Sequence, residues 1–279
     1  MKVFALDEET SQAGALVYWR LEGEVDPKEL ALHWKLAGLD PDLLPSTPAP
    51  STALARTMRE RAEHRKLVRP LEERGSHALV REVVSGADLS YDVALRVKLD
   101  VAGRPVVEPA GHPLEATIRA AYDHHLEVCS SDDIGGWLVG IVAKVDGVAM
   151  RDRGGIYYVP PGKLAEWDSM TSALRKVSNH RIFKIPAMTS KSAVEAILDA
   201  IAQEAEADAA KMEAELLSDE LGGRALASRV AKTEALEAKV SRYESLLGEK
   251  LDVLRDRLEG LRANLTVAIL KAQNPETMT

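Results

Sequence analysis

The densest group of chemically active side chains lies near the middle of the sequence. Two histidines, a cysteine and three aspartates, all of types that bind metal ions, stand within eleven residues at 123–133. His125 and Cys129 are four positions apart on a predicted helix, so both could face one ion. Further ligands would come from a neighbouring aspartate or a distant histidine. The candidate metal site consists of Asp123, His125, Cys129 and Asp132.

Such a site would be typical of a metal-dependent hydrolase. The alternative is that the histidines are exposed and that Ser131-Asp132 caps the helix that follows. Cys129 is the only cysteine, which excludes an internal disulfide and a metal cage built of several cysteines. Between these two interpretations we favour the structural one.

A second group of chemically competent residues is basic and aromatic. Residues 151–191 hold eight basic and three acidic side chains, in a chain whose net charge is −8. Basic side chains neutralise phosphates and exposed aromatic rings stack on bases, so this composition suits a single-stranded nucleic acid. The candidate residues are Arg151, Arg153, Tyr157, Tyr158, Lys163, Arg175 and Lys176.

Two alternatives remain for this basic region. Because neighbouring residues of a strand point to opposite faces, at least one of Tyr157 and Tyr158 would lie in the core. The basic side chains could then form a solvated face, or a face that docks on an acidic helix such as 195–220.

Other catalytic signatures are missing from the sequence. The glycines at 135, 136 and 140 follow a helix rather than a strand, and no Lys-Ser or Lys-Thr comes after them. That spacing excludes a P-loop and a dinucleotide fingerprint. There is also no Gly-x-Ser-x-Gly nucleophile elbow. We therefore expect no cofactor, and we favour a protein that is not an enzyme.

Composition describes a chain of one large or two modest domains. Its 279 residues are 46% hydrophobic and 29% charged. No apolar run approaches the ~20 residues that a membrane-spanning helix needs. The first residues turn acidic before a secretory apolar stretch could form. We expect a cytoplasmic protein with no membrane partner.

The C-terminal third is predicted to be helical. Apolar positions at intervals of three and four residues mark a helix over 190–217, a Gly222-Gly223 pair interrupts it, and a second helix is predicted over 224–272. The cleanest stripe of the second helix consists of Leu251, Leu254, Leu258, Leu261 and Leu265.

Charge and length predict how these two helices pair. Residues 190–221 carry nine acidic and two basic side chains, whereas residues 222–272 carry ten basic and seven acidic ones. Opposite charges favour an antiparallel hairpin of the coiled-coil type. The second helix would extend about 20 residues past the first, at 1.5 Å per residue. We favour burial of its leucine stripe in a homo-oligomer; the alternative is a helix that completes its own domain.

The N-terminal region mixes strands with helices. Strands are predicted at 13–22, 77–84, 91–101 and 181–186, and Val148 to Pro161 is predicted to form a β-hairpin. No βαβ unit repeats, so we predict an α+β fold with a mainly antiparallel sheet. The expected domains are an α+β head at 1–189 with a sub-boundary near 110, a helical hairpin at 190–274 and a disordered tail at 275–279.

The hairpin sequence Gly154-Gly155-Ile156-Tyr157-Tyr158-Val159-Pro160 carries a resemblance. Together with the Leu44-Pro45 loop and the Ala53-Leu54-Ala55-Arg56 helix, it resembles an uncharacterised family from phages, plasmids and prokaryotic mobile elements. The shared pattern is Gly-Gly-Ile/Val-Tyr-Tyr/Phe-Val-Pro. The resemblance implies a mobile-element setting, and it implies no activity and no catalytic residues.

These observations favour a non-enzymatic assembly or scaffold protein that self-associates, or captures a partner, through its C-terminal helices. The second hypothesis is a nucleic-acid-binding protein that uses the basic aromatic region at 151–191. The third is a metal-dependent hydrolase.

Overall fold

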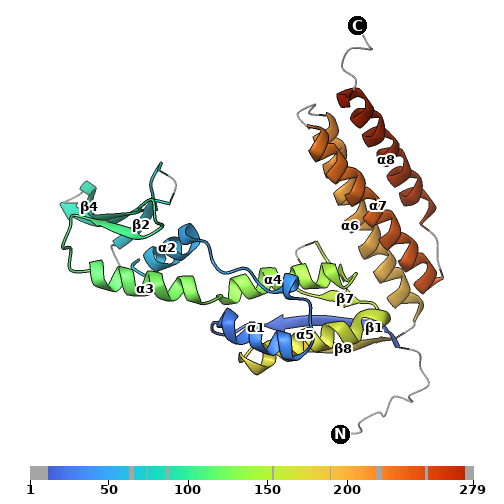
Figure 1. Cartoon of the computed structure of the whole chain (residues 1–279), viewed down its shortest axis with the longest axis horizontal. Helices are drawn as coiled ribbons and strands as arrows, with labels where there is room; N and C mark the ends of the chain where they lie inside the picture. The colour runs from blue at the N-terminus through green and yellow to red at the C-terminus, as the bar shows by residue number, and fades with distance from the viewer. Residues whose placement is uncertain are drawn as a thin grey trace. The chain divides into compact units, whose positions relative to one another are not determined.

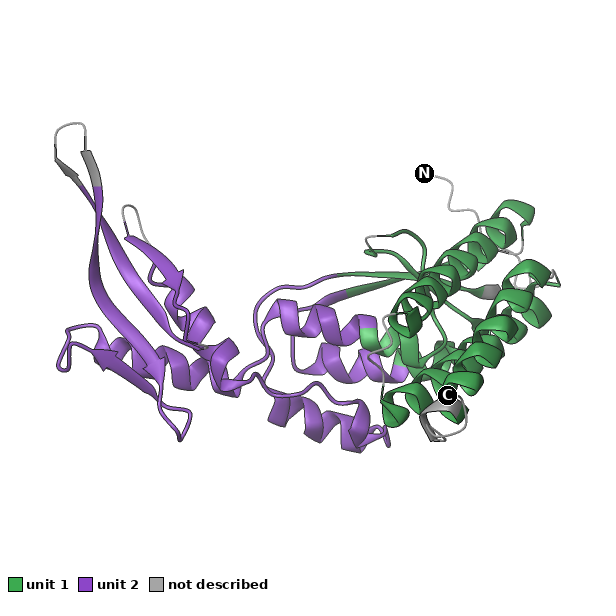
Figure 2. Cartoon of the chain, turned by 90° about the horizontal axis from the view of Figure 1, so that it is seen from above, with its two compact units in different colours: residues 1–19, 140–168, 182–279 green, residues 20–139, 169–181 purple. Residues whose placement is uncertain are grey.

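The computed structural model describes residues 12–62, 66–73, 75–85, 88–152, 154–188, 190–217, 222–248 and 251–273. The chain forms two compact units (Figure 2). Unit 1 comprises residues 1–19, 140–168 and 182–279, and unit 2 comprises residues 20–139 and 169–181. The boundary expected at residue 189 therefore falls inside unit 1. The tail at 275–279 lies outside the described residues.

Unit 1 is built on a four-stranded sheet whose strand order is β6-β7-β1-β8. The strands are β1 (Gln12–Arg20), β6 (Val148–Ala149), β7 (Tyr157–Val159) and β8 (Arg181–Met188). β7 pairs antiparallel with β6 on one side and with β1 on the other. The β-hairpin expected between Val148 and Pro161 is thus confirmed; it contributes the edge strand β6 and the central strand β7.

Aromatic and aliphatic side chains cover both faces of this sheet. On one face Trp19 stacks on Tyr157, with ring centroids 4.9 Å apart, and lies beside Trp167 of α5 (Leu164–Lys176). On the other face Tyr158 packs in a core that includes Ile201. Strand alternation explains the division, because Tyr157 and Tyr158 point to opposite faces.

Three helices complete unit 1: α6 (Lys191–Leu217), α7 (Gly223–Leu247) and α8 (Asp252–Gln273). They pack pairwise as a bundle (Figure 1). The single helix expected over 224–272 is wrong, because the chain turns at Gly248. Gly248 has φ 74°, the left-handed conformation that ends helices, and its N–H donates to the carbonyl of Glu244 at 2.9 Å.

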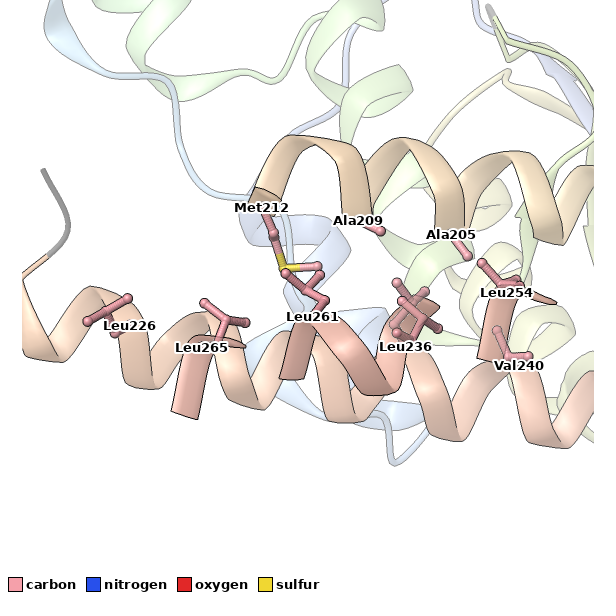
Figure 3. Close-up of a cluster of buried hydrophobic side chains, with 10 residues drawn as sticks. Ala205, Ala209, Met212, Leu226, Leu236, Val240, Leu254, Leu261 and Leu265 are labelled. Carbon is pink, nitrogen blue, oxygen red and sulfur yellow. The ribbon is translucent and has the colours of Figure 1, made fainter. Parts of the chain in front are cut away.

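The bundle interior is a continuous apolar cluster to which all three helices contribute (Figure 3). Leu254, Leu258, Leu261 and Leu265 are buried there against side chains such as Met212 and Leu236, which the other two helices supply. Leu251 is partly buried beside them. The leucine stripe is therefore covered within one chain. This burial agrees with the second alternative, a helix that completes its own domain, rather than with burial between copies.

Ion pairs join the helices in the antiparallel arrangement that charge predicted. Acidic side chains of α6 pair with basic side chains of α7, and as the α7 position advances, the α6 position recedes. The pairs are Arg229 with Glu215 at 2.6 Å, Lys232 with Asp208 at 2.9 Å and Lys239 with Glu204 at 2.6 Å. α8 joins them through Arg257 and Glu213, 2.8 Å apart.

Unit 2 contains a second antiparallel sheet with strand order β2-β3-β4-β5. Its strands are β2 (Lys66–Pro70), β3 (His77–Ser85), β4 (Asp88–Leu99) and β5 (Pro105–Glu108). One face packs on the helices α2 (Pro50–Arg59) and α3 (Glu115–Glu127), through residues such as Leu54, Leu95 and Ile118. Two antiparallel sheets with segregated helices confirm the α+β class.

Unit 2 also contains α1 (Pro27–Leu36), the short helix η1 (Pro41–Leu43) and the first part of α4 (Ser131–Lys144). The indole N–H of Trp34 donates to the carbonyl of Asp40, and that of Trp137 donates to the carbonyl of Leu43, both at 2.7 Å. Asp26 caps α1, since its carboxylate accepts from the N–H of Lys28 at 2.7 Å. No helix in the described ranges combines the length and hydropathy that crossing a bilayer requires.

Candidate functional site

Among the described residues, the aromatic members of the group expected to bind nucleic acid are not exposed. Tyr157 and Tyr158 are both buried in unit 1, so neither ring is open for a base to stack on. Lys163 forms an ion pair with Glu166 at 2.9 Å. Arg151, Tyr157, Tyr158 and Lys163 belong to unit 1, Arg175 and Lys176 belong to unit 2, and Arg153 lies outside the described residues.

The structure does not place Cys129 beside His125 on one helix, as the metal site expected from the sequence requires. α3 ends at Glu127, so Cys129 does not share a helix with His125. Cys129 is instead paired through its backbone with Val25. Burial, together with the nearby carboxylate of Asp133, raises the pKa of the Cys129 thiol to about 11, so the thiol is protonated at neutral pH.

Asp133, the last acid of that segment, caps and anchors α4. Asp133 accepts hydrogen bonds from the N–H and the hydroxyl of Ser130, at 2.9 and 3.0 Å, and lies 2.6 Å from the guanidinium of Arg56. The Ser130 hydroxyl accepts in turn from the N–H of Asp133 at 3.3 Å. The cap is thus Ser130 with Asp133, one residue before the expected Ser131-Asp132. Asp132 is exposed.

A different set of metal-competent atoms converges in unit 2. One ligand atom each from Glu24, His124 and His125 lies within 4.8 Å of the others. His124 Nε2 is 2.7 Å from a carboxylate oxygen of Glu24, and His125 Nε2 is 2.8 Å from a carboxylate oxygen of Glu60. Asp123, the other candidate from this helix, is exposed and outside this group.

Unit 1 has an open apolar pocket between the end of the β-hairpin and α7. It has a volume of about 260 Å³ and is lined by Pro160, Pro161 and Gly162 together with Tyr243 and Leu246. We call it the hairpin–α7 pocket. The two prolines that follow β7 thus form one wall of the pocket, and α7 forms the other.

Charged groups at the rim of the hairpin–α7 pocket are already paired. Arg242 lies 2.6 Å from the carboxylate of Asp146, and Lys163 pairs with Glu166. Tyr243 donates its hydroxyl to the carbonyl of Asp146 at 2.6 Å, and burial raises the pKa of that hydroxyl far above its ordinary value. The pocket is therefore an apolar cavity whose neighbouring charged and polar groups are already paired with one another.

Sequence reasoning missed Glu24 and the α7 residues of the pocket. Glu24 is 100 positions from His124, and the backbone bridge between Val25 and Cys129, with a hydrogen bond from the Ser131 hydroxyl to the carbonyl of Gly23, brings it near. Tyr243 carried a usable signal, since it is the only aromatic residue after Phe183. A lone aromatic on the apolar stripe of a helix indicates a specific contact, although its partner could not be named.

The fold and the pocket define an α+β protein of two compact units, one of which joins a β-hairpin sheet to a three-helix bundle. The chain belongs to the DUF6744 family, a family of unknown function, whose model matches residues 13–275. No curated protein and no solved structure shows significant similarity to it.

Proposed function

We propose that this protein is a non-enzymatic assembly protein that docks a second copy of itself at the hairpin–α7 pocket of unit 1. The observation that carries the proposal is the apolar cavity of about 260 Å³ formed by Pro160, Pro161, Tyr243 and Leu246. A cavity of that size suits one or two large apolar side chains, which is how protein interfaces are anchored. A phage or mobile-element setting and a cytoplasmic location are parts of the same proposal.

The chemistry of the pocket supports binding rather than catalysis. General acid–base catalysis needs a group that exchanges protons near the working pH. The Tyr243 hydroxyl is held far from that condition by burial, and Asp146 is engaged by Arg242. These groups are placed to shape a surface rather than to transfer protons.

The contact surface proposed here differs from the leucine stripe that the sequence suggested. Leu254, Leu258, Leu261 and Leu265 are buried within the bundle, and a second copy could reach them only if the bundle opened. Leu246 of α7, by contrast, is 41% exposed at the pocket rim. Self-association through the C-terminal helices is therefore assigned to the outer face of α7.

The test is light scattering on the full chain over a range of micromolar concentrations, with absorbance at 260 and 280 nm. We expect a defined oligomer, which Leu246→Arg converts to smaller species because a buried unpaired charge opposes association. The matched control is Val253→Arg on α8, which is 86% exposed and outside the pocket lining, and which should leave the mass unchanged.

Two results would contradict the proposal. A wild-type chain that stays monomeric throughout the concentration range would exclude docking of a second copy. An oligomer that Leu246→Arg and Val253→Arg leave equally intact would place the contact elsewhere. Co-purified nucleic acid, recognised by a raised absorbance at 260 nm, would favour the nucleic-acid hypothesis instead.

A further inference from the structure

We propose that Glu24, His124 and His125 form a binding site for a first-row transition metal ion, with Zn²⁺ as the best fit. This site lies within unit 2 and does not depend on the proposed function of the hairpin–α7 pocket. Its ligand atoms all lie within 4.8 Å of one another. It differs from the site expected from the sequence, with which it shares only His125.

The main chain on both sides of the site is fixed by ordinary packing. His124 and His125 occupy the last turn of α3, which packs on α2 and on the sheet. Val25, the neighbour of Glu24, exchanges two backbone hydrogen bonds with Cys129 at 2.8 and 2.9 Å, and both residues are fully buried. Glu24 is therefore brought to the end of α3 by the fold, without help from an ion.

Glu60 prepares His125 to be a ligand. His125 is the buried member of the trio, with 8% of its side chain exposed, and its Nε2 lies 2.8 Å from the Glu60 carboxylate at the C-cap of α2. A carboxylate on one ring nitrogen holds the proton there and leaves the lone pair on the other, Nδ1. Histidine ligands in metalloproteins are commonly oriented by such a carboxylate.

The remaining two ligands can close on an ion without moving the backbone. Ligand atoms 2.0–2.2 Å from a tetrahedral Zn²⁺ are about 3.3–3.6 Å apart. The Glu24 and His124 side chains, 39% and 55% exposed, lie 2.7 Å apart and have room to rotate. Binding of an ion requires side-chain rotations that bring all three atoms, now within 4.8 Å of one another, into that range.

The ligand set selects the class of metal. Two imidazoles and one carboxylate suit Zn²⁺, Co²⁺ or Ni²⁺, whereas Mg²⁺ and Ca²⁺ prefer sets made of oxygen alone. Three protein ligands also leave a fourth position for water or for a donor from another molecule. The site would thus be an open one.

The experiment is titration of the full, tag-free chain with Zn²⁺ by calorimetry, and with Co²⁺ by visible absorbance. We expect one ion per chain and the intense d–d bands of four-coordinate Co²⁺. Glu24→Gln and His124→Ala change exposed side chains and should weaken binding by roughly 10-fold or more, and Glu60→Gln should weaken it by roughly 10–100-fold.

The controls separate this site from the one expected from the sequence. Asp123→Asn is the matched control, because Asp123 is exposed on the same helix and outside the trio. Asp123→Asn and Cys129→Ala should leave the affinity and the Co²⁺ spectrum unchanged. Failure of the wild-type chain to bind either ion would overturn the proposal, as would equal binding by His124→Ala and the wild type.

Discussion

The Tyr243 hydroxyl donates a hydrogen bond to the backbone carbonyl of Asp146, at 2.6 Å, across 97 positions of sequence. The same ring meets Tyr158 edge-on, with centroids 6.0 Å apart. One side chain of α7 therefore contacts both the segment that precedes β6 and the β-hairpin itself. These contacts explain why the C-terminal helices and the hairpin sheet form a single compact unit.

Removal of the Tyr243 hydroxyl should destabilise unit 1. Tyr243→Phe keeps the ring and leaves the Asp146 carbonyl without its donor, so we expect the free energy of unfolding to fall by about 1–3 kcal/mol. Urea denaturation followed by circular dichroism measures the change. Tyr91→Phe is the control, because Tyr91 is 50% exposed on β4 and should give a change near zero. Equal stability of Tyr243→Phe and the wild type would show that the hydrogen bond is not formed.

Lys239 should contribute more to stability than the other lysine pairs between α6 and α7. Its ammonium donates to the buried carbonyl of Gly147 at 2.8 Å as well as to Glu204 at 2.6 Å. Lys239→Met should cost about 1–3 kcal/mol, because both acceptors lose a charged donor. Lys232→Met removes only a surface pair with Asp208 and should cost about 1 kcal/mol or less. The two variants are compared by urea denaturation, and a larger cost for Lys232→Met would contradict this ranking.

Local signals in the sequence predicted most of the elements of this fold. The hairpin between Val148 and Pro161 and the pairing of the oppositely charged helices α6 and α7 each follow from local sequence patterns, and each is present in the structure. Such signals are reliable because a turn or an ion pair involves few residues, and the residue types that it needs can be recognised in the sequence itself.

The parts that the sequence could not predict depend on long-range contacts or on one backbone angle. The leucine spacing continues across Gly248 without interruption, so periodicity predicted one helix where a left-handed glycine makes two. Because the chain turns there, α8 folds back on α7, and Leu258 is buried inside the bundle rather than left for a second copy of the chain. Glu24 is brought to His124 by a backbone bridge that no local pattern encodes.

Leu258 tests whether the leucine stripe belongs to one chain. Leu258→Ala opens a cavity in a fully buried position, so we expect a loss of about 2–5 kcal/mol of unfolding free energy. The urea midpoint of the variant should lie below that of the wild type by the same amount at every protein concentration, since the core is intramolecular. Val253→Ala, at an exposed position of α8, should cost about 0.5 kcal/mol or less. A difference that grows as the protein is diluted would indicate a core shared between chains.

Cys129 should resist thiol reagents in the folded protein. Its side chain is buried and its pKa is raised to about 11, so little thiolate is present at pH 8 and the reagent cannot approach it. Labelling with a chromogenic disulfide should be slow in buffer and rapid in concentrated urea, where the full equivalent reacts. Rapid labelling of the native chain would show that the Val25–Cys129 bridge opens easily, and would weaken the case that this bridge fixes Glu24.

Asp133 should make unit 2 sensitive to acid. Burial raises the pKa of its carboxyl, but the hydrogen bonds from Arg56 and Ser130 outweigh burial and hold the pKa below its ordinary value. A carboxyl whose folded pKa is depressed stabilises the protein fully above its unfolded pKa, about 3.9, and the contribution is lost as the pH falls through the folded pKa. The difference in unfolding free energy between the wild type and Asp133→Asn should therefore be largest at neutral pH and shrink below about pH 4. Glu29→Gln removes an exposed carboxylate from the first turn of α1 and is the control. A wild-type advantage over Asp133→Asn that stays constant from neutral pH into acid would show that ionisation of Asp133 is not the source of that advantage.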